Sequence, residues 1–174
     1  ALADWYPVTV GEAPLHLARL MCQRTNLHYD SNLRRSYASV LRRTAFAVPV
    51  VLALATAVVT NKITDFLLLL ATVTPLIAWC LREAYRQQDT ADALENLMAQ
   101  ARELWSDALA DRCGADHCAA RAREFQGAIF NRRATATPIL PGVYASQRAG
   151  LEDEMYAAAA DFLSEYERTK GTCA

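Results

Sequence analysis

Two apolar runs follow one another in the middle of the chain, at residues 44–60 and 66–81. They are 17 and 16 residues long, contain no charged residue, and are separated by the polar segment 61–65. A helix rises about 1.5 Å per residue, so crossing a hydrocarbon core about 30 Å thick takes roughly 17–25 residues. The pattern predicts a helical hairpin at residues 44–81 that crosses a membrane twice.

A second interpretation stays open for the same hairpin. Runs this short also occur as buried helices at the centre of a soluble helical bundle. Pro49 and Pro75 lie inside the runs. They favour the membrane, because neighbouring membrane helices re-satisfy the carbonyl that a proline leaves without its donor.

The charges around the hairpin predict its orientation. Its tip carries only Lys62, balanced by Asp65, whereas both ends are basic. Positive charge accumulates on the cytoplasmic side, so we expect both ends of this chain in the cytoplasm. Arginine side chains at the ends can also extend toward water and lengthen each span. The basic residues are Arg34, Arg35, Arg42 and Arg43 before the hairpin, and Arg82 and Arg86 after it.

Helical periodicity predicts an all-α fold, since no segment alternates long enough to predict a strand. We expect a short helix at 15–24, then a second one that starts near Ser31 and continues into the first span. The second span should continue without a break to about residue 112, with Gly114 as its stop. Further helices are predicted at 116–131 and at 146–168, the last capped by Ser146. This gives three regions: a cytoplasmic segment 1–43, the hairpin 44–81, and a cytoplasmic stalk and bundle 82–174.

Each predicted cytoplasmic helix has one apolar face, so these helices should pack together. The stripe in residues 94–109 could instead recruit a soluble partner, which would make the protein a membrane scaffold without a pore. The stripes are Leu94, Leu97, Met98, Ala101, Leu104, Trp105, Ala108 and Leu109; Cys118, Ala122, Phe125 and Ile129; and Leu151, Met155, Ala159, Phe162 and Tyr166.

Composition excludes some functions. The chain has 18 basic and 19 acidic residues, a balance that argues against general nucleic-acid binding. Its five cysteines are dispersed and lie mostly in segments placed in the cytoplasm, so we expect reduced thiols. Cys113, His117 and Cys118 resemble half of a zinc site, but no second Cys/His pair follows. We predict no metal, no cofactor and, without a catalytic motif, no enzymatic activity.

One polar cluster is a candidate ligand site: Gln23, Arg24, Asn26, Arg34 and Arg35. Arginine forks suit phosphate, so the cluster could bind an anionic ligand. The alternative is polar packing between helices. A second cluster, Glu124, Gln126, Asn131, Arg132 and Arg133, is open to the same two interpretations.

Hydroxyl groups are the polar side chains well inside the spans: Thr56, Thr60, Thr72 and Thr74. Threonines in helices usually bond back to their own backbone. The same residues could line a pore formed by several hairpins. Charged residues are absent from both runs, which disfavours an ion or proton transporter.

Several short motifs, taken in order, resemble a known family. They are Asp4-Trp5-Tyr6-Pro7, Cys22-Gln23-Arg24-x-Asn26, Asp30-x-x-Leu33-Arg34-Arg35-x-Tyr37, and Phe125-Gln126-x-x-Ile129-Phe130-x-x-Arg133. The hydrophobic hairpin lies between the third and fourth, and a proline-rich break and Tyr144 ahead of Glu152 follow. This order resembles the S-4TM pore-forming effectors, which accompany bacterial nucleotidyltransferases that make cyclic oligonucleotide alarm signals.

The resemblance implies a role as well as a fold. It implies an effector of antiphage defence in the bacterial inner membrane, a homo-oligomer that disrupts the lipid bilayer when a cyclic oligonucleotide or a partner activates it. The family name implies four spans where this chain shows two. The resemblance would place the other pair before Ala1.

Overall fold

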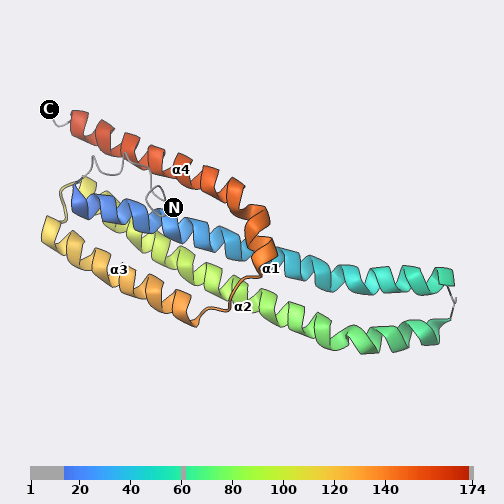
Figure 1. Cartoon of the computed structure of the whole chain (residues 1–174). Helices are drawn as coiled ribbons and strands as arrows, with labels where there is room; N and C mark the ends of the chain where they lie inside the picture. Colours follow the sequence, from blue (N-terminus) through green and yellow to red (C-terminus); the bar gives the residue numbers. More distant parts are fainter. Residues whose placement is uncertain (1–13, 60–61, 173–174) are drawn as a thin grey trace. The chain divides into compact units, whose positions relative to one another are not determined.

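The computed structural model describes residues 14–59 and 62–172, which form four helices and no strand. In chain order they are α1 (Leu15–Val59), α2 (Ile63–Leu109), α3 (Ala115–Thr135) and α4 (Pro141–Thr172) (Figure 1). The predicted all-α class is confirmed.

Helix α1 is longer at its start than the sequence predicts. It runs from Leu15 to Val59 without the expected break between residues 24 and 31, so the prediction of a separate short helix is wrong. Hydroxyl groups here bond back to the same helix: Thr25 Oγ1 donates to the Met21 carbonyl at 2.8 Å, and Ser31 Oγ to the His28 carbonyl at 3.0 Å. Such bonds let these residues remain within a helix.

Helix α2 confirms the unbroken helix predicted after the hairpin, because it extends from Ile63 to Leu109. Gly114 is not its stop. The helix ends earlier, in a turn where Asp111 adopts a positive φ of 53° and the Arg112 amide donates to the Asp107 carbonyl at 2.9 Å. Aspartate tolerates this left-handed conformation better than most residues. Gly114, with φ −65°, is the N-cap of α3.

The last two helices begin earlier than predicted; the predicted face is confirmed for α3 and, on α4, for Phe162 and Tyr166. All four apolar residues expected on α3 are buried: Cys118, Ala122, Phe125 and Ile129. Helix α4 starts at Pro141, because proline suits the first turn of a helix. Ser146 is not its cap; its hydroxyl donates to the Val143 carbonyl at 2.9 Å. Phe162 and Tyr166 pack in the core as expected, whereas the side chains of Leu151, Met155 and Ala159 lie outside the described set.

The chain divides into two compact units. The first, here the body unit, comprises the described residues of Ala1–Leu33 and Thr90–Ala174. The second, here the hairpin unit, is Arg34–Asp89. The predicted region boundaries at residues 43 and 82 lie inside the hairpin unit, which extends beyond the apolar runs at both ends.

All four helices contribute to the core of the body unit. Trp105 of α2 is 1% exposed, and its ring lies 6.0 Å from that of Phe162. Its Nε1 donates to Glu165 Oε2 at 3.2 Å. The predicted packing of these helices on one another is therefore present. The buried residues of this cluster are Leu17, Leu20, Met21, Ala101, Leu104, Trp105, Cys118, Ala122, Phe125 and Tyr166.

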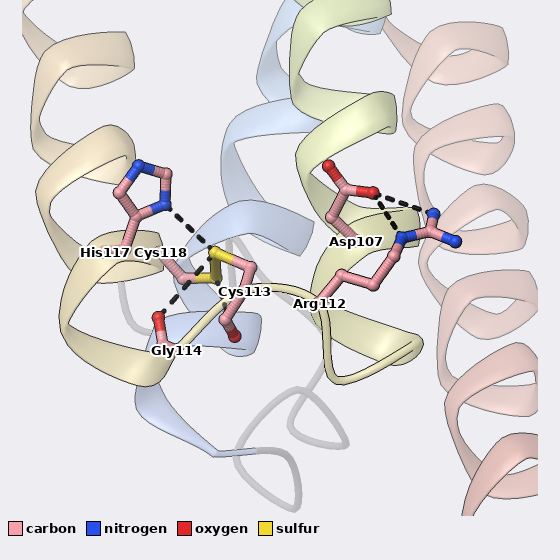
Figure 2. Close-up of a disulfide and its surroundings, with 6 residues drawn as sticks. All are labelled: Asp107, Arg112, Cys113, Gly114, His117 and Cys118. Carbon is pink, nitrogen blue, oxygen red and sulfur yellow. Dashed lines mark hydrogen bonds and ion pairs between the residues drawn. A yellow bond between two sulfur atoms is a disulfide. The ribbon is translucent and has the colours of Figure 1, made fainter.

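A disulfide joins the turn after α2 to the start of α3. It pairs Cys113 with Cys118, and Cys113 Sγ also lies 3.2 Å from His117 Nδ1 (Figure 2). The prediction of reduced thiols is wrong for this pair, since a separation of five residues across the turn brings the two side chains together. Cys22 and Cys80 are free, and Cys173 lies outside the described residues. Within residues 14–59 and 62–172, no three metal-ligating side chains converge.

Candidate functional site

The outward surface of the hairpin unit is covered with large apolar side chains. Val58 is 87% exposed, Phe46 70% and Leu68 69%. Only 11% and 6% of the most apolar 18-residue segments of α1 and α2 are buried, whereas a helix at the core of a soluble protein is mostly buried. The exposed residues are Phe46, Val50, Val51, Leu54, Val58, Val59, Ile63, Leu67, Leu68, Leu69, Leu76 and Trp79.

The two helices of the hairpin unit bury a narrow seam. On α2 the less exposed positions recur every three or four residues, which is the spacing of one helix face against a partner helix. Ala38 and Ala84 are 0% and 2% exposed, and such small residues allow two helices to approach closely. The α2 positions are 66, 70, 73, 77, 80, 84 and 87.

The threonines predicted to line a pore do not share one surface. Thr56 is 7% exposed and donates to the Leu52 carbonyl at 2.9 Å, so it belongs to the buried seam. Thr72 and Thr74 are exposed and donate to the carbonyls of Leu68 and Leu70. Residues that are two positions apart on a helix point in directions about 200° apart, so Thr72 and Thr74 of one helix cannot both face the same pore. Thr60 lies outside the described residues.

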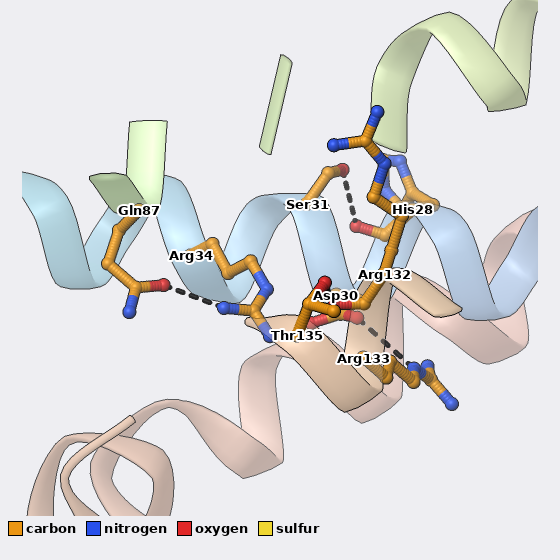
Figure 3. Close-up of polar contacts among 8 residues, drawn as sticks. All are labelled: His28, Asp30, Ser31, Arg34, Gln87, Arg132, Arg133 and Thr135. Carbon is orange, nitrogen blue, oxygen red and sulfur yellow. Dashed lines mark hydrogen bonds and ion pairs between the residues drawn. The ribbon is translucent and has the colours of Figure 1, made fainter. Parts of the chain in front are cut away.

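A buried polar chain connects α1 to α2 within the hairpin unit. Arg34 Nη1 donates to Gln87 Oε1 at 2.7 Å (Figure 3). Gln87 Nε2 in turn donates to Glu83 Oε1 at 2.7 Å. The three side chains are 7%, 1% and 4% exposed. Arg34 therefore has a structural partner. Sequence reasoning missed Glu83 and Gln87, although their spacing of four residues on a helix was a usable signal.

Gln23 and Asn26 lie toward α3. Gln23 Nε2 donates to the Ala122 carbonyl at 2.7 Å and to Gln126 Oε1 at 3.4 Å. Asn26 and Gln23 line one open cleft together with Gln126. The structure thus joins the first polar cluster to a residue of the second cluster, in a contact between helices.

An ion pair joins Asp30, which lies on α1 between the members of the first cluster, to Arg133 of the second cluster. Arg133 Nε donates to Asp30 Oδ2 at 3.2 Å, and Asp30 is 8% exposed (Figure 3). Part of each cluster therefore performs polar packing between α1 and α3. Arg35, in the hairpin unit, is half-buried.

Arg24 has a different environment. It is 4% exposed, and its guanidinium carbon lies 3.8 Å from the centre of the Phe162 ring on α4. The pKa of Arg24 is lowered to about 10, first by burial and second by the charge of Arg102, while Glu165 acts in the opposite direction. The residues predicted to bind one ligand thus have three different surroundings.

A model of one protein family matches residues 1–162 of the 174-residue chain. Its description is "SMODS-associating 4TM effector domain". The chain belongs to this family. No curated protein and no solved structure matches it.

Membership in the 4TM effector family agrees with the geometry of the hairpin unit. Two helices of the described residues are long and apolar enough to cross a bilayer. The apolar outer surface of the hairpin unit is the surface that lipid would contact. The 4TM effector domain described here is therefore a membrane-associated one.

Proposed function

We propose that this 4TM effector domain forms part of a pore in the bacterial inner membrane and acts in antiphage defence. In this proposal the body unit receives a cyclic oligonucleotide signal or a partner. Membrane helices of several copies, the hairpin among them, then rearrange into a leak. Family membership supports the effector role, and the residues of the hairpin support its membrane part.

The observation that carries the proposal is the apolar outer surface of the hairpin unit. Burial of apolar surface gives about 25 cal/mol per Å², so large side chains such as Phe46 and Leu54, 70% and 64% exposed, need a non-aqueous environment. Lipid supplies that environment around the whole hairpin. A soluble bundle would instead cover these side chains with its own helices.

The orientation follows from the arginines at the base of the hairpin. Arg42, Arg43 and Arg82 are exposed. Arg43 donates to Ser39 Oγ at 3.0 Å, so it points back along the helix, away from the apolar run. Both features support an arrangement with the two ends of this chain in the cytoplasm.

The positions of the threonines constrain how the pore would form. A water-filled path past Thr56 needs the seam between α1 and α2 to open. A path past Thr72 or Thr74 needs the outer surfaces of several hairpins to meet, with one of the two facing the path. A homo-oligomer is required in the second case.

Leakage in cells tests the proposal. The full protein is expressed under activating conditions, and loss of membrane potential is followed with a potential-sensitive dye. We expect depolarisation with the native protein and none with Val51→Arg, because arginine at the centre of a span costs about 2.5–3.5 kcal/mol. Asn96→Arg, on an exposed part of α2 in the body unit, should behave as the native protein. Intact potential in cells with activated native protein contradicts the proposal.

The scaffold alternative depended on a free stripe in residues 94–109. Leu94, Ala101 and Trp105 are 1%, 0% and 1% exposed, since they face the core of the body unit. The partners of this stripe are helices of the same chain. The burial of this stripe therefore favours the pore over the scaffold.

A further inference from the structure

An open cavity of about 1020 Å³ lies in the body unit between α1, α2 and α4. Its volume lies just above the usual range of small-molecule sites, about 300–1,000 Å³. Arg24, Thr25 and His28 line it from α1. Residues of α2 and α4 complete the lining, among them Arg102 and Arg168.

Arg24 is the buried charge in this lining. Its side chain is 4% exposed, and Nε has no hydrogen-bond partner within the described part of the chain. An unsatisfied polar group of this kind is costly, and its presence calls for an explanation. The Phe162 ring lies 3.8 Å from the guanidinium carbon and contacts the group by its face, which supplies no acceptor for Nε.

The charges around Arg24 indicate what would complete its contacts. The charge of Arg102 acts on Arg24 in the direction that disfavours its protonated form, so the two guanidinium groups repel each other. Arg168 lines the same cavity. An anion placed among three arginines would relieve this repulsion and accept charge-assisted hydrogen bonds.

Carboxylates line the cavity as well. Glu95, Asp161 and Glu165 supply oxygen atoms that can accept hydrogen bonds from N–H groups. Asp161 and Glu165 are exposed, so solvent screens their charge more than that of buried Arg24. The lining thus offers arginine donors for phosphate oxygens and carboxylate acceptors for N–H groups, and a nucleotide carries both kinds of group.

We propose that this cavity binds a phosphate-bearing ligand of the nucleotide class, with Arg24 and Arg102 on its phosphate and Arg168 beside them. That this ligand is the activating signal rests on the proposed function above, whereas the binding of the ligand to the cavity does not. The site includes one residue of the cluster found in the sequence, Arg24. Arg102 and Arg168 were not among the residues predicted from sequence.

Binding is measured on the full protein in detergent micelles by calorimetry. The probes are a cyclic adenine dinucleotide, ATP, inorganic pyrophosphate and glycerol 3-phosphate, the last as a stand-in for a lipid headgroup. We expect a nucleotide to bind more tightly than pyrophosphate or glycerol 3-phosphate. Loss of one charged hydrogen-bonding partner, as in Arg102→Ala, should weaken binding by about tenfold or more.

Two further variants are measured, one within the cavity and one control outside it. Arg24→Met retains the contact with Phe162 and removes the charge, and circular dichroism checks that the variant is folded. Arg123→Ala removes an exposed arginine of α3 that does not line the cavity, so it should bind as the native protein. The proposal is overturned if no phosphate compound binds, if glycerol 3-phosphate binds as tightly as the nucleotides, or if Arg102→Ala and Arg24→Met bind unchanged.

The two proposals fail in different ways. If nucleotides bind but cells are not depolarised, the cavity is a binding site and the pore proposal is wrong. Depolarisation that persists in Arg102→Ala and Arg24→Met, with no nucleotide binding to the native protein, retains the pore and rejects the cavity.

Discussion

Replacing Gln87 by leucine should destabilise the hairpin unit far more than its single position suggests. Gln87 connects two ionisable side chains, Arg34 and Glu83, through hydrogen bonds of 2.7 Å each, and it is itself 1% exposed. Leucine has a similar size but neither donates nor accepts. The variant removes both bonds while Arg34 and Glu83 stay buried.

The magnitude follows from those two bonds. A hydrogen bond to a charged group contributes about 1.5–3 kcal/mol, so the two together contribute about 3–6 kcal/mol. The apolar surface that leucine buries offsets part of this loss, since one buried side chain gains about 1.5–3 kcal/mol. We expect a net loss of about 1.5–3 kcal/mol, or roughly 3–12 °C in Tm for a chain of this size.

The assay is thermal unfolding of the full protein in detergent, followed by circular dichroism at 222 nm. Gln100→Leu is the matched control, because Gln100 is exposed on the same helix. It should change the free energy of unfolding by less than about 0.5 kcal/mol. A triple variant, Arg34→Met with Glu83→Leu and Gln87→Leu, removes the charges together with their bonds and should recover most of the loss.

Two results would refute the reasoning. Equal melting curves for Gln87→Leu and Gln100→Leu would mean that the polar chain contributes nothing to stability. A triple variant less stable than Gln87→Leu would mean that the loss does not come from the hydrogen bonds that buried Arg34 and Glu83 lose.

Three further predictions concern the body unit. Trp105→Ala should lower the free energy of unfolding by about 3–5 kcal/mol through the cavity it leaves, whereas Phe130→Ala, at a 68% exposed position, should leave the midpoint of chemical denaturation almost unchanged. Similar midpoints for the two variants would contradict the assignment of the core. Reduction of the Cys113–Cys118 disulfide should lower the free energy of unfolding by about 2 kcal/mol, the value for a loop of five residues. Cys113→Ser should melt identically with and without dithiothreitol, and identical curves for the native protein in both conditions would count against the bond. Burial raises the pKa of the Cys22 thiol, so its alkylation by iodoacetamide, followed by mass spectrometry, should be slow at pH 7, and its rate should still increase above pH 9. A rate that reaches a plateau below pH 8 would be inconsistent with that shift.

The elements that could be predicted from sequence are those set by hydrophobic periodicity. The α3 face of Cys118, Ala122, Phe125 and Ile129 repeats at three and four residues, and all four are buried. The continuation of α2 beyond the second span follows from the absence of glycine and proline between Leu81 and Gly114. Helix ends depend on backbone details with weaker sequence signals. Asp111, with its positive φ, and Pro141, at the first turn of α4, determine two of them.

The ligand site was harder to predict because the sequence pattern predicted a helix break between residues 24 and 31. Without one continuous helix, the residues that share a face could not be identified. With α1 continuous through residues 23–26, Gln23 and Asn26 are three positions apart and face the same side, toward α3. Arg24 is turned about 100° from Gln23, toward Phe162 of α4. Adjacent polar residues in one helix therefore serve different neighbours, and a cluster in sequence is not a cluster in space. Arg102 joins Arg24 only through the packing of α2 against α1, which no local pattern in the sequence contains.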